Sequence, residues 1–360
     1  MTGLERTRAA IRGDPVDRIP TFPILLAPAC RLTGVPQGRY MTDPVVMADT
    51  LLQARAMCGF DGIYVSRDNW VYHQALGGEL VFPDDDESFS RTPLLASIRD
   101  FRRLSVPDPG SAPGMTTLLA AARRVMAAAG REYYVQANID TGPFSLAAVL
   151  RGTQDFLMDL STEKESDLRD FLGFCTEVVT AYGRAMIDTG VHGIQFGDST
   201  ASLISPDDYR RFVLPYQETA VDALKDRGCD LWIHICGKTD HLLHLMRELP
   251  IQGFEVDAKV EMTQARELLG ARIALKGNLD TTFLLQRSPE EVTRACRRML
   301  EDGGFKTGVI LSPGCGVPRM TPLENLRAMV RACEELGRDL RTPLSPARIS
   351  PCTRSPSRGS

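Results

Sequence analysis

Short runs of apolar and β-branched residues recur along the chain, and most of them are separated by stretches with helical periodicity. Glycine, aspartate or asparagine bounds most runs, which is typical of strands buried in a parallel sheet. The pattern predicts eight strands, at Pro20–Ile24, Gly62–Val65, Tyr133–Ala137, Gly193–Phe196, Leu231–Ile235, Gly253–Val256, Ile273–Lys276 and Thr307–Leu311. Eight alternating strand–helix units favour a closed (β/α)8 TIM barrel. An open doubly wound sheet is the alternative, because the number of strands does not establish closure.

Helix start signals stand between several of these strands. Ser205, Ser288 and Thr321 are each followed by a proline and, three residues on, by an acidic side chain. A hydroxyl at the N-cap, a proline at the first helical position and an acid at the third stabilise a helix N-terminus together. The three segments therefore predict helices that begin at the prolines.

The spacing of the predicted strands is uneven at one place. About seventy residues separate the second strand from the third, whereas most connections in compact domains are short. The polar segments Phe82–Glu87 and Val106–Pro113 lie in this interval, and we expect an insertion over one end of the barrel, as a lid or a subdomain. The last residues, Arg341–Ser360, are rich in arginine, proline and serine, which predicts a disordered tail. The chain thus divides into a barrel domain, 1–337, and a tail, 338–360.

Charge and composition narrow the function classes. Lys and Arg number 42 against 46 Asp and Glu, and the formal net charge of −4 argues against a general nucleic-acid-binding protein. No apolar run approaches the length of a membrane span, and the segment Met1–Arg12 is charged without an apolar core. The nine cysteines are scattered and odd in number, which is typical of a reduced chain. We therefore expect a cytoplasmic protein that binds neither nucleic acid nor membrane.

Polar and metal-ligating side chains follow most of the predicted strands. In a barrel of this kind the chemistry lies at the carboxyl ends of the strands, so these residues are candidates for a functional site. In chain order they are Asp68, Asn138, Asp198, His234, Cys236, Glu255, Asp257, Asn278 and Cys315. Their accumulation is more than chance placement would give, although each residue alone has a structural explanation.

His234 and Cys236 form the strongest local pattern. Residues two apart in an extended strand point to the same side, and Gly237 lets the chain turn immediately afterwards. Cys315, flanked by glycines after the last predicted strand, supplies a third ligand. One imidazole and two thiolates are the donor set of an open zinc site whose fourth position is free for substrate. Taken alone, His234 and Cys236 are explained more simply by a buried thiol beside a core histidine.

Three longer segments add a family resemblance. Asp68 with Gln74–Gly77 resembles the strand-two aspartate segment of the uroporphyrinogen decarboxylase superfamily. The stretch Ile204–Tyr216 resembles its S-P-x-x-F-x-x-F-x-x-P-Y segment, and Gly277–Asp280 resembles its G-N-x-D segment. The resemblance covers nearly all of residues 1–337, and it implies a (β/α)8 barrel with its site at the carboxyl end.

Two branches of this superfamily differ in chemistry, and the chain resembles one of them more. The decarboxylase binds substrate carboxylates through an R-Q-A-G-R motif, whereas Ala27–Arg31 here retains one arginine of the pair. The zinc-dependent cobamide methyltransferases carry H-x-C-G, S-P-G-C-G-x-P and T-P-x-E-N, which His234–Gly237, Ser312–Pro318 and Thr321–Asn325 resemble. The resemblance implies a corrinoid-dependent methyltransferase. A decarboxylase of a porphyrinogen or related carboxylate is the alternative, because Asp68 suits it equally well, and a non-catalytic corrinoid- or metal-binding protein is a third hypothesis.

The methyltransferase resemblance also implies a cofactor and its partners. Zinc held by His234, Cys236 and Cys315 would let a small-molecule thiol acceptor ionise and attack the methyl group of a methylcobamide. No corrinoid-binding D-x-H-x-x-G stretch occurs in the sequence. We therefore expect the cobamide to arrive on a separate corrinoid protein or as a free cofactor.

Roles can also be assigned to the other polar residues at the strand ends. We assign Asp68, Asp198 and Glu255 to catalysis, and Asn278 and Asp257 to cofactor binding. Asp198, Glu255 and Asp257 are also candidates to orient the zinc histidine or to fill the vacant metal position. The sequence does not choose among them, and it leaves the identity of the thiol open.

Overall fold

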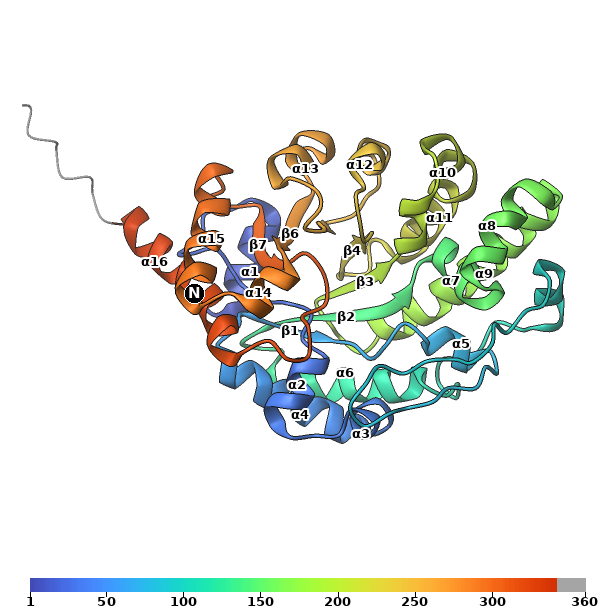
Figure 1. Ribbon diagram of the computed structural model, residues 1–360, viewed down its shortest axis with the longest axis horizontal. Helices are drawn as coiled ribbons and strands as arrows, with labels where there is room; N and C mark the ends of the chain where they lie inside the picture. Colours follow the sequence, from blue (N-terminus) through green and yellow to red (C-terminus); the bar gives the residue numbers. More distant parts are fainter. Residues whose placement is uncertain (342–360) are drawn as a thin grey trace, which may run out of the picture.

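Seven parallel strands form one curled sheet in this computed structural model, which describes residues 1–341 (Figure 1). Each strand pairs with its neighbours in sequence, in the order β1 to β7. The strands are β1 Gly62–Val65, β2 Tyr134–Thr141, β3 Gly193–Gly197, β4 Asp230–His234, β5 Gly253–Glu255, β6 Ala274–Leu279 and β7 Val309–Pro313. Nearly all of their residues are buried, as expected for a parallel sheet covered on both faces. The predicted barrel-like α/β class is confirmed.

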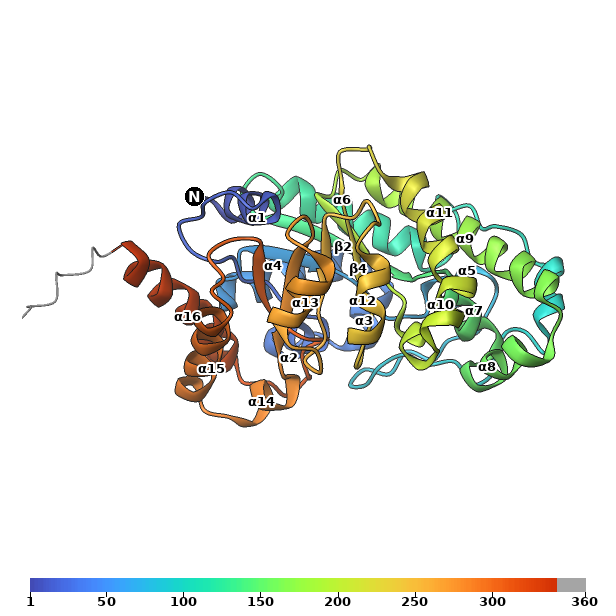
Figure 2. The same ribbon diagram turned by 90° about the horizontal axis from the view of Figure 1, so that it is seen from above.

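Helices cover the outer face of the sheet in both ribbon views (Figures 1 and 2). The α-helices are α1 Gly3–Arg12, α2 Ala27–Thr33, α3 Gln37–Thr42, α4 Pro44–Cys58, α5 Val71–Ala75, α6 Met115–Ala129, α7 Pro143–Arg151, α8 Thr153–Thr162, α9 Glu165–Ile187, α10 Pro206–Phe212, α11 Leu214–Leu224, α12 Asp240–Met246, α13 Met262–Leu269, α14 Thr281–Gln286, α15 Pro289–Asp302 and α16 Leu323–Arg341. The 3-10 helices are η1 Ile98–Arg103 and η2 Ser199–Leu203. Within this layer α9 packs against α7 and α11, and α15 packs against α16.

The predicted helix start signals are visible as caps. The Ser205 hydroxyl accepts a hydrogen bond from the Asp208 N–H (3.1 Å) at the start of α10. Ser288 and Glu291 form a reciprocal capping box at the start of α15. The third helix, α16, begins at Leu323, one residue after Pro322, where the sequence predicts its start.

The first predicted strand, Pro20–Ile24, is wrong as a strand. It forms one isolated parallel bridge, between Thr21 and Leu311. The Thr21 carbonyl accepts from the Asp61 N–H (2.9 Å), and the Leu311 N–H donates to the Pro20 carbonyl (2.9 Å). Prolines at positions 20 and 23 have no N–H to donate, so a regular ladder cannot form. The segment still connects β7 to the residue before β1, as an irregular seam in place of an eighth strand.

The expected insertion after β1 is a long and mostly irregular segment, residues 66–114, which contains α5 and η1. Val81 and Phe89 form an isolated antiparallel bridge within it. The Gln37 N–H donates to the Asp84 carbonyl (2.8 Å) and so ties the segment to α3. Residues 85–88 reach a cavity at the carboxyl end of the sheet, which is the position that the sequence predicts for the insertion.

The last helix, α16, spans the expected domain boundary at 337/338 and is described as far as Arg341. The rest of the predicted disordered tail, residues 342–360, lies outside the described residues. Among residues 1–341, no helix has the length and apolar character that a membrane crossing requires.

Candidate metal centre

His234, the last residue of β4, is held by the neighbouring strand. Its side chain is buried, and its Nδ1 lies 3.0 Å from the Glu255 carbonyl oxygen, opposite it in the ladder between β4 and β5. A carbonyl oxygen only accepts, so Nδ1 carries the proton in this contact. In the neutral imidazole the other ring nitrogen, Nε2, then carries the lone pair that can bind a metal.

Cys236 follows two residues later on the same side of the chain. Its Sγ lies 2.9 Å from His234 Nε2. Gly237 adopts a φ of +95°, a left-handed conformation that glycine reaches without strain, and the chain turns away there. The Gly237 N–H donates to Asp257 Oδ2 (2.8 Å), which fixes the turn. The pairing of His234 with Cys236 that the two-residue spacing predicts is present.

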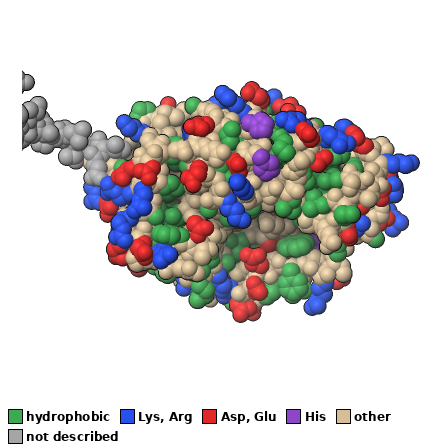
Figure 3. Space-filling model, turned by 45° about the horizontal axis from the view of Figure 1, so that its top comes forward, with side chains coloured by type: hydrophobic (Ala, Val, Ile, Leu, Met, Phe, Trp, Pro, Cys, Tyr) green, Lys and Arg blue, Asp and Glu red, His purple; other side chains and the backbone are tan. Residues whose placement is uncertain are grey.

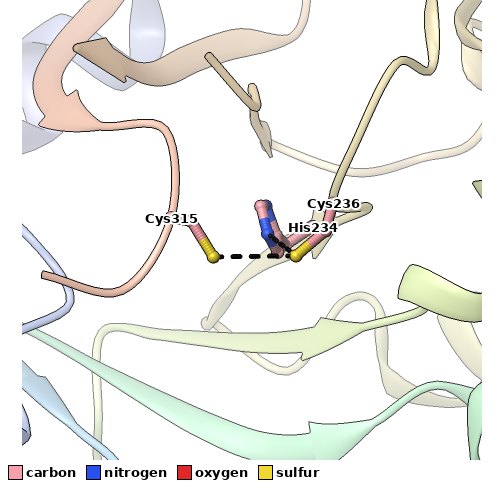
Figure 4. A group of neighbouring side chains, drawn as sticks. All are labelled: His234, Cys236 and Cys315. Atoms are coloured by element: carbon pink, nitrogen blue, oxygen red, sulfur yellow. Dashed lines mark hydrogen bonds between the residues drawn. The ribbon is translucent and has the colours of Figure 1, made fainter. Parts of the chain in front are cut away.

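Cys315 arrives from the loop after β7. Its Sγ lies 3.6 Å from Cys236 Sγ, and the three ligand atoms lie within 4.8 Å of one another (Figure 4). A Cβ on the preceding residue, Gly314, would come 2.2 Å from the Ala258 nitrogen, so only glycine allows the loop to approach this closely. The loop that carries the third ligand is thus pressed against the residues after β5.

The separation of these atoms fits a tetrahedral zinc site. Two thiolates bound to one zinc ion at about 2.3 Å each lie about 3.8 Å apart, close to the 3.6 Å between Cys236 and Cys315. The contact of His234 Nε2 with Cys236 Sγ, at 2.9 Å, has the length of a hydrogen bond, and it would open to about 3.6 Å around a shared ion. Donor types and spacing therefore both suit the ion.

The three groups perturb one another's protonation without any metal. A hydrogen bond with Cys315 lowers the pKa of Cys236 to about 7, against the opposing effect of burial. The same hydrogen bond, together with burial, raises the pKa of Cys315. Burial lowers the pKa of His234, but the Cys315 sulfur and the Glu255 carboxylate outweigh it and raise the value to about 9. One sulfur of the pair therefore ionises readily, as a metal ligand must.

The three ligand side chains line a cavity of about 590 Å³. Its walls come from the ends of β1, β2 and β3, from residues 66–70 and 85–88, and from the loop 315–319. Figure 3 shows a hollow in this side of the molecule, with acidic and apolar side chains at its edge. The volume is typical of small-molecule sites, so a small acceptor fits beside the cluster.

Asp68 is the one predicted catalytic acid that lines this cavity. Its carboxylate accepts hydrogen bonds from Arg67 Nε (3.1 Å), from the Trp70 N–H (3.1 Å) and from the Ser88 hydroxyl. The first two contacts organise the residues after β1, and the third ties them to the insertion. Asp68 thus connects the insertion to the end of the strand.

Glu255 points into the barrel interior and does not line the cavity. Its carboxylate accepts from Lys276 Nζ (2.9 Å) and Gln136 Nε2 (3.1 Å). Lys276 Nζ in turn lies 4.3 Å from the Phe22 ring centre and 4.6 Å from that of Tyr64. Burial lowers the pKa of Lys276, and the Glu255 charge opposes that shift. The main chain of Glu255 orients His234, while its side chain is anchored in a buried ion pair.

Asp198, after β3, lies outside the cavity lining and is fully buried. Its two oxygens accept from the Ser145 N–H (2.7 Å) and from Gln217 Nε2 (2.9 Å). Burial raises the pKa of Asp198, and these two hydrogen bonds oppose the shift. The contacts join the end of β3 to α7 and α11.

Asp257 and Asn278 organise the loop after β5, and neither side chain belongs to the cavity lining. Asp257 accepts from the Gly237 N–H and from the Lys259 N–H, both at 2.8 Å. Asn278 Nδ2 donates to the Asp257 carbonyl (3.0 Å) and to the Val260 carbonyl. Through Gly237, Asp257 supports the turn directly after Cys236.

The cavity also contains residues that the sequence did not single out. Tyr64 and Gln195 line it and share a hydrogen bond of 2.6 Å between the Tyr64 hydroxyl and Gln195 Oε1. Arg319 and Gln37 line it as well, and they contact each other. Arg319 had a signal, since it follows Cys315 by four residues, but Gln37 is 282 residues away and no spacing could have linked the two.

Arg31, the arginine retained from the decarboxylase-like motif, is used inside the protein. Its Nε donates to the Arg319 carbonyl (2.7 Å) and its Nη2 to the Thr321 carbonyl (2.6 Å). Arg31 is absent from the cavity lining. Its guanidinium thus holds the loop after Cys315 in place.

Comparisons with known proteins agree with this geometry. The chain is 30% identical over 341 residues to the methylcobamide:CoM methyltransferase MtbA of Methanosarcina acetivorans, covering 92% of this chain and 98% of that protein. It is 29% identical over 292 residues to the uroporphyrinogen decarboxylase of Methylobacillus flagellatus, covering 76% and 78%. A solved methyltransferase structure from Methanosarcina mazei superposes with a TM-score of 0.85 at 25% identity, covering 93% of this chain and 99% of the other.

The family assignment follows from the whole length of the barrel. The protein-family model described as uroporphyrinogen decarboxylase (URO-D) matches residues 2–336. This range includes every strand and all three candidate ligands. This agrees with the resemblance that the motifs carry. The chain therefore belongs to the uroporphyrinogen decarboxylase (URO-D) family.

Proposed function

We propose that this protein transfers a methyl group from a methylated corrinoid to a thiol, with zinc as its cofactor. The observation that carries the proposal is the convergence of His234, Cys236 and Cys315 at the wall of a cavity, with their ligand atoms within 4.8 Å. Relatives named methylcobamide:CoM methyltransferase, similar over 92% of the chain, support the reaction class.

The donor set supports zinc rather than a harder metal. One neutral imidazole and two thiolates suit zinc, and they neutralise its double positive charge. His234, Cys236 and Cys315 would hold the ion at the cavity wall, and a ligand from the cavity would complete its coordination. A bound zinc ion would supply the charge that lets an incoming thiol lose its proton near neutral pH.

The chain's own contribution is orientation and proximity. The Glu255 carbonyl holds the His234 ring, and Asp257 holds the turn after Cys236. In the transfer, a sulfur–carbon bond forms while the cobalt–carbon bond breaks. The electron pair of the broken bond stays on cobalt as cob(I)amide, and the thiol proton leaves to solvent. Holding the two reactants in line accounts for a large part of the rate acceleration in such a step.

The other predicted site residues are assigned supporting roles. We propose that Asp68 positions the insertion at the mouth of the cavity, and that Asp198 fixes the end of β3. Glu255 orients His234 through its main-chain carbonyl, the Asp257 carboxylate holds the Gly237 N–H, and the Asn278 amide holds the Asp257 carbonyl. In this proposal none of these five residues is a metal ligand.

The methyl donor is proposed to reach the cavity on a separate corrinoid protein. This rests on the absence of a D-x-H-x-x-G stretch from the sequence. A cytoplasmic location is proposed as well, because the eight cysteines among the described residues are all free, as in a reducing compartment. Decarboxylation is the weaker alternative, since Arg31 is bound to main-chain carbonyls and is not available for a substrate carboxylate.

Elemental analysis and methylcobalamin demethylation with a panel of thiols test the proposal. We expect about one zinc per chain and formation of cob(I)alamin only when a thiol is present. Cys236→Ser should lose most of its zinc and most of its thiol-dependent formation of cob(I)alamin. Cys229→Ser is the matched control, because Cys229 is a thiol outside the cluster. Full thiol methylation by the metal-free protein would contradict the proposal.

A further inference from the structure

Asp140, near the end of β2, is a buried carboxylate that the proposed metal chemistry does not use. Its φ of +73° is a left-handed conformation that residues other than glycine rarely adopt, and its N–H donates to Asn138 Oδ1. Its Oδ2 accepts from the Tyr72 N–H (2.9 Å) in α5. Asp140 thus joins β2 to the first helix of the insertion.

The other oxygen of this carboxylate lies near polar groups that are also unsatisfied. Asp140 Oδ1 has no hydrogen-bond partner among the described residues, and the same holds for the hydroxyls of Tyr72 and Tyr182 and for Arg67 Nη2. The two tyrosine rings meet edge to face, with their centres 5.7 Å apart. A buried carboxylate oxygen without a donor holds its charge at a high cost, whereas a carboxylic acid carries no charge. The geometry therefore favours the protonated form of Asp140 while α5 is packed against β2.

The charges around Asp140 agree with this geometry. Burial raises the pKa of Asp140 from 3.8 to about 7, and the Tyr72 N–H opposes that shift. The negative charge of Asp68 adds to the shift, and the positive charge of Arg67 opposes it. Both residues lie between β1 and α5, while Tyr182 faces Asp140 from α9. The neighbouring charges have opposite signs, so burial decides the protonation of Asp140.

The other elements around β2 add no charge at this place. The charged side chains of α6 and most of those of α9 are exposed. Asp167 of α9 pairs with Arg99 of the insertion at 2.9 Å. Arg151 of α7 pairs with Asp155 and Asp159, both at 2.8 Å. These groups are therefore engaged away from Asp140.

His73 is the other side chain on α5 that titrates near neutral pH, and its effect has the opposite sign. Its ring centre lies 5.4 Å from that of Trp70, and a Cβ on Gly78 would lie 1.8 Å from its Nδ1, so the ring faces the insertion. Burial lowers the pKa of His73. Its contribution to the packing of α5 is thus lost as the pH falls, whereas that of Asp140 is lost as the pH rises.

The segment that Asp140 holds is suited to local opening. α5 has five residues, and most of the insertion around it is irregular. Segments with little regular structure open at a lower free energy than the core of the same protein. Residues 66–70, directly before α5, line the cavity. A change in the packing of α5 therefore changes one wall of the cavity.

We propose that the proton of Asp140 controls whether α5 stays packed against β2: the acid form keeps the helix in place, and the ionised form favours its release. The pKa of Asp140 is raised in the packed state and returns toward 3.8 when water reaches the carboxyl group. The stabilisation of the packed state is therefore complete below pH 3.8 and is lost as the pH rises through about 7. This inference does not depend on the proposed function.

Hydrogen exchange of the full-length protein, measured by mass spectrometry on peptides that cover residues 66–76, tests the proposal. Protection factors, corrected for the intrinsic exchange rate at each pH, should fall about tenfold or more from pH 5 to pH 8. Most of this fall should occur below about pH 7. Unchanged protection, or protection that increases with pH as His73 alone predicts, would overturn the proposal without any variant.

Asp140→Asn identifies the group that titrates. Asparagine tolerates the left-handed backbone and keeps an acceptor for the Tyr72 N–H, but it does not ionise. The variant should therefore be about tenfold or more better protected than the wild type at pH 8, with little dependence on pH. A fall in protection of the wild-type size in the folded variant would overturn the assignment.

Two further variants separate Asp140 from other carboxylates. Asp68→Asn should keep the fall in protection and move its midpoint to lower pH, because the charge of Asp68 raises the pKa of Asp140. Asp230→Asn is the matched control. Asp230 is a half-buried carboxylate at the start of β4, it accepts from the Tyr134 hydroxyl (2.7 Å), and burial raises its pKa as well. The wild-type fall in protection at residues 66–76 should persist in this control, and its loss there would overturn the assignment to Asp140.

Discussion

The two ends of the barrel use charge in opposite ways. At the amino end, Asp61 accepts from Arg6 Nη1 (2.6 Å), Arg18 Nη1 (2.7 Å) and the Thr21 N–H (2.9 Å), so its charge is fully satisfied inside the protein. At the carboxyl end, the cavity contains two thiols with an imidazole, and Arg319 pairs with no carboxylate among the described residues.

This difference separates groups that stabilise the barrel from groups that are available for a ligand. Charges paired internally at the amino end hold α1, the irregular seam and β1 together. At the carboxyl end Arg319 contacts an amide in place of a carboxylate, and Gln37 Nε2 has no hydrogen-bond partner, which is costly unless a ligand satisfies these groups. In barrels of this class the carboxyl end carries the chemistry and the amino end the stability, and the charge arrangement follows that division.

The largest expected effect comes from removing the imidazole at the carboxyl end. His234→Ala should lower methyl transfer about a thousandfold, equal to about 4 kcal/mol in the barrier, because two thiolates alone hold zinc weakly. The thermal unfolding midpoint should change little, measured by circular dichroism on metal-free samples of both proteins. Comparable losses of activity and of fold would show that the two ends do not divide their roles.

The second effect is at the amino end, where a substitution should lower stability and leave function unchanged. Asp61→Asn leaves Arg18 near an uncharged partner, while Arg6 keeps its ion pair with Asp17, and we expect a loss of about 3 kcal/mol in the free energy of unfolding. Zinc content and methyl transfer by the folded protein should be unchanged. Asp188→Asn is the control, because Asp188 is exposed and pairs with Arg227 at 3.7 Å, which predicts a loss below about 1 kcal/mol. A loss of zinc or of methyl transfer by folded Asp61→Asn would break the comparison.

A smaller effect is expected at Asp68. Asp68→Asn keeps one acceptor oxygen for Arg67, Trp70 and Ser88, so methyl transfer should fall less than about tenfold. The measurement is kcat/KM with methylcobalamin and an active thiol. A near-complete loss, together with decarboxylation of a porphyrinogen by the wild type, would instead assign Asp68 a central role in a decarboxylase.

The smallest effect concerns acid stability. Burial raises the pKa of Asp17, but Arg6 outweighs it and lowers the value from 3.8 to about 2. A depressed pKa stabilises the folded chain above pH 3.8, and that contribution disappears as the pH falls toward 2. Asp17→Asn lacks it, so the difference in unfolding free energy between wild type and variant should shrink from pH 6 to pH 3. Urea titrations at both values test this, and a constant difference would contradict it.

The cluster of His234, Cys236 and Cys315 could be predicted because its signals are local. His234 and Cys236 share one face by strand geometry alone, and Cys315 lies in a glycine-flanked loop after a strand. Seven of the eight predicted strands are present for the same reason, as buried apolar runs. The eighth predicted strand, Pro20–Ile24, is not a strand. Its apolar pattern resembles the others, but its two prolines leave too few N–H donors for a ladder.

The surroundings of the candidate metal centre depend on contacts that the sequence does not encode locally. Asp198 follows β3 and its carboxylate contacts α7 and α11, and Asn278 lies within β6 and contacts the loop after β5, whereas Asp68 lines the cavity. Position at a strand end does not determine side-chain direction. Arg319 and Gln37 meet only because the last loop folds back on α3, across 282 residues of sequence.

X-ray absorption at the zinc edge tests the central claim most directly, namely that His234, Cys236 and Cys315 hold a zinc ion with one position open to the acceptor. The resting protein should show two sulfur ligands and one imidazole nitrogen, and an active thiol should add a third sulfur. The Cys236→Ser, Cys315→Ser double variant should contain little zinc. Unchanged coordination on addition of an active thiol, or stoichiometric zinc in the double variant, would contradict the claim.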